Sequence, residues 1–78
     1  MTKGQMEKAN FVMNCVEPML AGIDPRISSV TYAASETGSE MVTIKWETDD
    51  GKLKDAVNVN VSHDSKAALV YDVIKIFL

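Results

Sequence analysis

The sequence predicts an α+β domain in which two helices cover one face of a three-stranded antiparallel sheet, in the order α-β-β-β-α. Three central segments alternate apolar and polar residues, as strands with one buried face do. A segment at each end repeats apolar residues every three or four positions, as amphipathic helices do. The pair Asp50-Gly51 between the last two strands is typical of a tight hairpin turn. The strands therefore form a meander of order 1-2-3, and residues 1–78 are expected to form a single domain.

Size and cysteine content limit how the domain can be stabilised. The chain has 78 residues and one cysteine, Cys15, so no disulfide can form within it. A domain this small buries only about 60% of the surface that its unfolded chain exposes. Additional stabilisation from a second subunit is therefore attractive. A lone cysteine and the lack of an apolar run after Met1 to Ala9 favour a cytoplasmic location.

The first helix is predicted over Gln5 to Ala21. Its apolar residues share one side of a helix and are expected to face the sheet; they are Met6, Ala9, Val12, Met13, Val16, Met19 and Leu20. Pro18 lacks an N–H donor and crowds the preceding turn, so a kink or break is expected near Glu17. Gly22 is expected to end the helix.

Turn chemistry and alternation together predict the register of the second hairpin. A two-residue loop at Asp50-Gly51 places Ile44 opposite Val57 and Val42 opposite Val59, all on the apolar face. The same register pairs Glu47 with Lys54 on the polar face. It also sets Trp46 across from Asp55, whose carboxylate would accept a hydrogen bond from the indole N–H.

The first hairpin is expected to turn around Thr37-Gly38-Ser39, with 36–40 as its loop. This loop pairs inward-facing residues with one another: Ala34 with Val42, Tyr32 with Ile44, and Val30 with Trp46. The polar face of the sheet is expected to face solvent.

The second helix is predicted over Lys66 to Leu78, after possible N-cap residues in 62–65. The side expected to pack on the sheet consists of Ala67, Val70, Tyr71, Ile74, Phe77 and Leu78. Leu69, Val73 and Ile76 fall outside that stripe, so the helix is apolar around most of its circumference. Such a helix needs a second neighbour besides the sheet.

Five apolar residues are candidates for a protein interface: Phe11, Cys15, Leu69, Val73 and Ile76. Phe11 and Cys15 lie one turn apart on the far side of the first helix from its apolar arc. A contiguous group of exposed apolar residues marks an interface, whereas single ones are common. The alternative is that these residues contact the other helix or a chain end, and the sequence leaves both possibilities open.

No pattern predicts catalysis, a cofactor or a metal. His63 is the one histidine, and no motif places it beside Cys15. We interpret His63 as a turn residue and Cys15 as a surface residue. Asp49, Asp50 and Asp55 surround one turn but lack the spacing of a calcium loop. The apolar part of Ala67 to Leu78 is too short for a membrane span, so no membrane partner is expected.

The order helix, meander, helix resembles the double-stranded RNA-binding domain, and Asp64-Ser65-Lys66-Ala67-Ala68 falls where that family begins its second helix. The resemblance implies a nucleic-acid-binding module. That family carries a basic cluster at this helix start, whereas here Lys66 stands alone beside Asp64. The net charge of −3 also argues against nucleic acid as a partner. The leading hypothesis is a small non-enzymatic cytoplasmic protein acting through protein association, as a homodimer, with nucleic-acid binding as the alternative.

Overall fold

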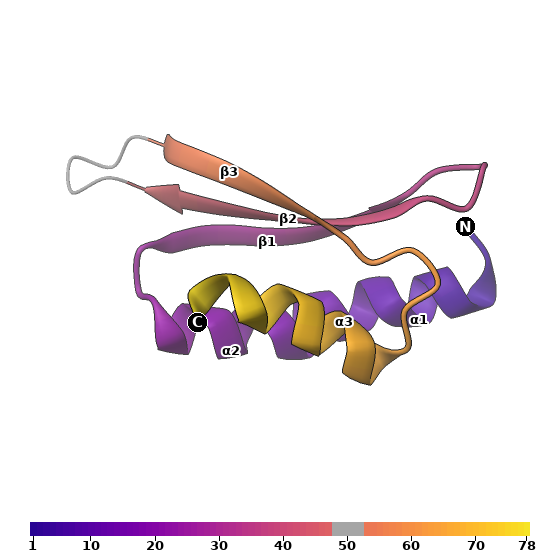
Figure 1. The fold of residues 1–78 in the computed structure, drawn as a ribbon, viewed down its shortest axis with the longest axis horizontal. Coiled ribbons are helices and arrows are strands. Elements are labelled where there is room, and N and C mark those ends of the chain that lie inside the picture. Colours follow the sequence, from indigo (N-terminus) through magenta and orange to yellow (C-terminus); the bar gives the residue numbers. More distant parts are fainter. Residues whose placement is uncertain (48–52) are drawn as a thin grey trace.

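The computed structural model describes residues 1–47 and 53–78, and for 53–55 only the backbone. It confirms the α+β fold class: the strands follow the order β1-β2-β3 and the helices lie together on one face of the sheet (Figure 1). The expected loop at Asp50-Gly51 and the acidic rim with Asp49 and Asp55 lie outside the described residues. The elements are α1 (Lys3–Phe11), η1 (Val12–Val16), α2 (Glu17–Ile23), β1 (Ile27–Ala34), β2 (Glu40–Glu47), β3 (Leu53–Asn60), α3 (Lys66–Ile74) and η2 (Lys75–Phe77).

The segments α1, η1 and α2 follow one another directly and form one long helix. Thr2 caps its start, because its hydroxyl accepts from the N–H of Gln5 while the Gln5 side chain accepts from the N–H of Thr2. Of the kink or break expected near Glu17, the structure shows no break. The helix instead widens into a π turn, in which the N–H of Glu17 donates to the carbonyl of Val12, five residues back. This wide turn directly precedes Pro18 and lets the helix continue past it to Ile23.

The core lies between the helices and the inner face of the sheet. Its buried residues are Val12, Val16, Leu20, Val30, Val42, Ile44, Val59, Val61, Leu69 and Val73. The apolar arc predicted for the first helix was too wide, because Met6, Met13 and Met19 are exposed. The long helix contacts β1 through all of its segments, so its buried stripe is only as wide as one strand requires.

The first hairpin turns earlier than expected. Tyr32 pairs with Val42, Val30 with Ile44 and Ala34 with Glu40, a shift of two residues from the predicted register. The cause is a three-residue loop, 36–38, that ends on Gly38 in a left-handed conformation with φ of 91°. A shift of two keeps every side chain on its predicted face, and the shorter loop adds Glu40 to β2, where it has the inward parity of Val42.

The predicted register of the second hairpin is confirmed where it is described. Val42 pairs with Val59 and Ile44 with Val57. The expected pair of Glu47 with Lys54 is wrong, because an irregularity between Lys45 and Glu47 pairs Glu47 with Leu53. Because of this irregularity, Trp46 does not pair with Asp55.

The indole N–H of Trp46 has a carboxylate acceptor, but it belongs to the long helix and not to β3. Its indole N–H donates to Oδ2 of Asp24 at 3.0 Å, at the C-terminal end of the long helix. Its ring packs against Phe77, with ring centroids 6.1 Å apart. This contact ties the C-terminal ends of both helices to β2.

The start of α3 is as predicted, but its rotation is not. Ser65 is the N-cap residue, since its hydroxyl accepts from the N–H of Ala68 at 3.1 Å. Leu69 and Val73 face the core with no exposed surface, while Tyr71 and Leu78 of the predicted stripe are 64% and 93% exposed.

Candidate binding groove beside strand β1

The outer edge of β1 presents unpaired main-chain groups. The N–H of Ser35 donates to the carbonyl of Ser39 at 2.8 Å, which marks these residues as a hydrogen-bonded pair. Hydrogen-bonded and non-hydrogen-bonded pairs alternate along an antiparallel ladder. The register therefore turns the N–H and carbonyl groups of Val30, Tyr32 and Ala34 away from β2 and towards the edge.

Glu17 covers part of this edge. Its Oε2 accepts a hydrogen bond from the N–H of Val30 at 3.1 Å. Proteins commonly protect edge strands with a charged side chain. Within the described residues, the N–H groups of Tyr32 and Ala34 make no side-chain hydrogen bond of this kind. Two successive outward-facing residues of β1 can therefore still pair with another strand.

A hollow of about 350 Å³ lies between this edge and the long helix. Ala9, Met13 and Glu17 are among its residues on the helix side, and Val30 and Tyr32 on the strand side. Met13 is 59% exposed, so it offers apolar surface to an incoming side chain. The π turn carries both Met13 and the buried Val12, and π turns occur frequently at functional sites.

A second hollow, of about 390 Å³, lies further along β1, at its end and beside its loop. Thr2 and Gln5 line it from the start of the helix, and Ala34, Ser35 and Glu36 from the strand and loop. We call the two hollows together the β1 groove. It follows β1 from Val30 to the loop, with an edge strand on one side and a helix on the other.

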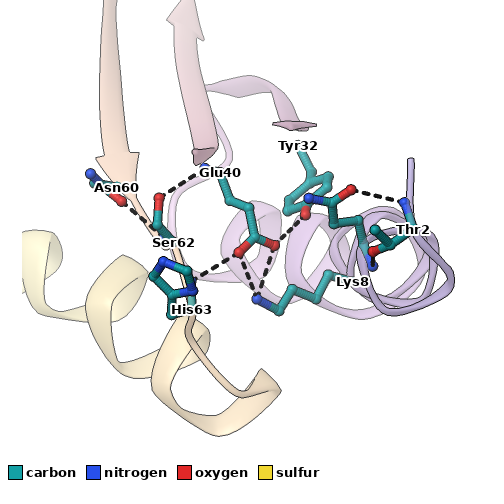
Figure 2. A network of polar contacts seen from close by, with 8 residues as sticks. Thr2, Lys8, Tyr32, Glu40, Asn60, Ser62 and His63 are labelled. Atoms are coloured by element: carbon teal, nitrogen blue, oxygen red, sulfur yellow. Dashed lines mark hydrogen bonds and ion pairs between the residues drawn. The ribbon is translucent and has the colours of Figure 1, made fainter. Parts of the chain in front are cut away.

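A buried carboxylate fixes the wall of this groove. Glu40 is 5% exposed and lies at the start of β2 (Figure 2). Lys8 from α1 donates to both of its oxygens, at 2.9 and 3.0 Å, and the Tyr32 hydroxyl donates to Oε1. The main-chain N–H of His63 donates to Oε2 at 3.0 Å, and the N–H of Glu40 donates to Ser62. One carboxylate thus joins α1, the sheet and the turn before α3.

The hydrogen bonds around Glu40 decide its ionisation. Burial by itself opposes the charge, but the donors Tyr32, Lys8 and His63 outweigh it and hold the pKa of Glu40 below its ordinary value. A carboxylate with a low pKa and filled acceptor sites is a poor general base. Burial, together with the hydrogen bond to Glu40, raises the pKa of Tyr32 well above its ordinary value. The cluster therefore holds the structure together and keeps the Tyr32 ring in place.

These pKa shifts predict how stability varies with pH. The depressed pKa of Glu40 gives a contribution that is lost as pH falls through that pKa, and the raised pKa of Tyr32 gives one that is lost as pH rises above about 10. Thermal unfolding of wild type and Tyr32→Phe should differ in its pH dependence on both sides. On the alkaline side the wild type alone loses the Tyr32 contribution, and on the acid side the variant loses stability at higher pH, because Glu40 has lost the donor that lowers its pKa most. Parallel alkaline limbs would contradict this role of Tyr32.

A pair of carboxyl groups, Asp64 and Asp72, joins the turn before α3 to that helix. A hydrogen bond to Asp72, followed in size by burial, raises the pKa of Asp64, and the same hydrogen bond lowers the pKa of Asp72. Oδ2 of Asp64 is buried and has no conventional hydrogen-bond donor among the described residues. A proton held by Asp64 and donated to Asp72 would satisfy both carboxyls. Asp72 also pairs with Lys75 at 3.3 Å.

The structure separates the residues predicted to form an interface. Leu69 and Val73 are buried in the core, so they pack within the chain, which was the alternative to an interface. Phe11 is half-buried against the core, with the Lys66 ammonium 5.8 Å from its ring centre. Cys15 is exposed, as expected, and Ile76 is 40% exposed. The predicted patch therefore does not exist as a continuous surface.

The turn residue His63 and the start of α3 lie where the sequence predicts them. His63 is an exposed turn residue, as expected, with a left-handed φ of 64° that directs its N–H to Glu40. Lys66, at the start of α3, lies over an aromatic ring, and Asp64 precedes it. In the described part of the chain no group of three or more His, Cys, Asp and Glu residues could hold a metal ion. No helix in that part is long and apolar enough to cross a membrane.

Sequence reasoning missed Glu40, Glu17 and Tyr32 as a connected set. Glu40 has the same parity as Val42 and Ile44, which predicts an inward side chain once β2 is started one residue earlier. The role of Glu17 at the edge had no comparable signal. Comparisons with protein-family models, with curated protein sequences and with solved structures found no match.

Proposed function

We propose that this protein acts by binding another protein, which contributes an extended segment as a fourth strand along β1. The observation that supports the proposal is the β1 groove: free main-chain groups at Tyr32 and Ala34 lie beside the long helix, which offers apolar surface at Met13 in the hollow next to Tyr32. In strand addition, main-chain hydrogen bonds provide affinity, and alternate side chains fill pockets next to the strand. The groove offers both features.

The partner segment should bring no helix of its own beneath the added strand. The long helix already lies along β1. Pairing β1 with the β1 of a second copy would set the two long helices about 4.8 Å apart, the spacing of neighbouring strands. A helix with side chains is about 10 to 12 Å wide, so the two helices would overlap. An extended segment of a partner fits this edge, whereas the homodimer expected from the sequence has also lost Leu69 and Val73 as contact surface.

Association is favoured over catalysis by the same geometry. The polar cluster of Figure 2 centres on Glu40, whose two carboxylate oxygens both accept from donors within the chain. In the described residues, neither the His63 nor the Cys15 side chain makes a hydrogen bond that would activate it as a nucleophile or base. A binding role needs none of these groups to react.

Selection from a library of random nonapeptides displayed on phage tests this function. Wild-type protein should enrich peptides with alternating apolar residues. Ala34→Pro should fail to enrich them, because proline removes the outward N–H without disturbing the bonds between β1 and β2. Amide exchange gives a second measurement: a recovered peptide should slow exchange at Tyr32 and Ala34, while Thr31 and Ala33 are protected already.

Met13→Lys provides an independent test that leaves the strand intact. It adds a charge to the helix side of the groove, whereas Asn14→Lys adds the same charge to the same helix at an exposed position outside the lining residues. Enrichment should fall for Met13→Lys and persist for Asn14→Lys. The proposal is wrong if wild type enriches no peptide over Ala34→Pro. A dimer seen in sedimentation that Met13→Lys leaves unchanged, together with a library that yields no ligand, would also contradict it.

A further inference from the structure

Each hollow of the β1 groove carries one carboxylate and no Lys or Arg side chain among its lining residues. Glu17 lines the hollow beside Val30, and Glu36 lines the hollow beside Ala34. These positions mark the two ends of the free edge. The whole chain also has a net charge of −3. The groove therefore has a carboxylate at each end, and its lining between them includes apolar surface at Ala9 and Met13.

Glu17 also limits how far a partner strand can pair. Its Oε2 already accepts from the N–H of Val30, so the partner finds free donors at Tyr32 and Ala34 but not at Val30. Oε1 of Glu17 accepts no hydrogen bond from the described residues. It can accept one from a cationic side chain that reaches the end of the paired segment.

We infer that the partner segment is an extended peptide with a basic residue at each end and alternating apolar residues between them. This inference rests on the proposed strand addition at β1 and specifies its ligand. Val30 and Glu36 are six positions apart along the chain. The strand covers the four positions from Val30 to Ala34 at about 3.3 Å each, and Glu36 lies in the loop beyond it, so we expect a partner of about five or six extended residues to reach from Glu17 to Glu36. Lys or Arg at that separation can contact both Glu17 and Glu36 while the residues between them pair with β1.

The apolar residues of the partner should alternate, because only every second side chain of a strand faces the helix. Those side chains reach the surface formed by Ala9 and Met13 in one hollow. In the other hollow they reach Thr2, Gln5 and Met1. The side chains between them face the same side as Thr31 and Ala33, on the open face of the sheet.

The sequences enriched from the nonapeptide library, and the affinity of one recovered peptide measured by fluorescence polarisation, test this inference. Wild-type protein should enrich Lys or Arg at two positions about five or six residues apart. Glu17→Gln should remove the preference at one end and Glu36→Gln at the other, each weakening the recovered peptide about two- to fivefold, as expected for a partly exposed ion pair. Glu7→Gln, an exposed acid on α1 outside the lining residues, is the matched control and should leave affinity unchanged.

The outcomes separate this inference from the proposed function. Enriched peptides without basic ends, or with affinities indifferent to both Glu17→Gln and Glu36→Gln, would overturn the inference and leave strand addition standing. No enrichment over Ala34→Pro would remove both. Affinity for the basic peptide should also fall as salt rises, because its ion pairs are exposed. An affinity that is independent of salt would likewise contradict the inference.

Discussion

Replacing Glu40 with alanine is expected to lower the free energy of unfolding by about 3 to 5 kcal/mol, the usual effect of removing one partner of a buried ion pair. The Lys8 side chain is 15% exposed, so its ammonium would remain largely shielded from water without a counter-charge. The Tyr32 hydroxyl and the N–H of His63 would also lose their acceptor. A chain of 78 residues has about 4 to 12 kcal/mol of stability, so the variant should lose at least about a quarter of it.

Urea denaturation followed by Trp46 fluorescence measures this effect. Glu36→Ala is the matched control, because Glu36 lies in the exposed loop of the same hairpin, and it should stay within about 0.5 kcal/mol of wild type. Glu40→Gln should fall between the two, since an amide keeps the shape and one acceptor but not the charge. A stability for Glu40→Ala equal to that of Glu36→Ala would show that Glu40 does not hold the elements together.

The fold class could be predicted from sequence because alternation in the strands survives errors of register. The first hairpin is shifted by two residues from its predicted pairing, yet Val30 and Tyr32 keep their predicted inner face. A strand has a period of two, so an even shift changes partners without changing faces. The shift does change the end of the ladder. Glu40 lies in β2 opposite Ala34 and not in the loop, and its buried side chain pairs with Lys8.

The β1 groove could not be predicted, because it depends on contacts between elements. Pro18 signals an irregular helix, but a π turn that lets the helix continue is one of several ways to accommodate it. Whether Glu17 reaches the N–H of Val30 depends on the position of the helix along β1, which no local pattern specifies. The sequence places Met6 and Met13 on the side of the helix that faces the sheet, but both are exposed. The width of the buried stripe depends on how many strands the helix covers, which is also a contact between elements.

The rotation of α3 was ambiguous because its sequence has apolar residues on nearly every side. From Lys66 to Leu78 only Lys66, Asp72 and Lys75 are charged, and they exclude few orientations. The structure selects the side with Leu69 and Val73. Contacts at both ends define that orientation: Lys66 lies over Phe11, and Phe77 packs on Trp46.

Leucine-to-alanine changes at the two leucines of this C-terminal segment should therefore differ sharply. Leu69→Ala removes a side chain with no exposed surface and is expected to lower the free energy of unfolding by about 2 to 5 kcal/mol. Leu78→Ala removes the same atoms from a residue that is 93% exposed, and it should change stability by less than about 0.5 kcal/mol. Both variants can be compared by urea denaturation at several protein concentrations.

Dependence on concentration distinguishes packing within the chain from packing between chains. If Leu69 contacts only its own core, the denaturation midpoint of Leu69→Ala shifts equally at every concentration. If Leu69 instead contacts a second copy, the wild-type midpoint rises with concentration and the variant loses that rise, because association stabilises by mass action. Equal effects of Leu69→Ala and Leu78→Ala would contradict the orientation of α3. A concentration-dependent wild-type midpoint that Leu69→Ala abolishes would restore the interface first expected from the sequence.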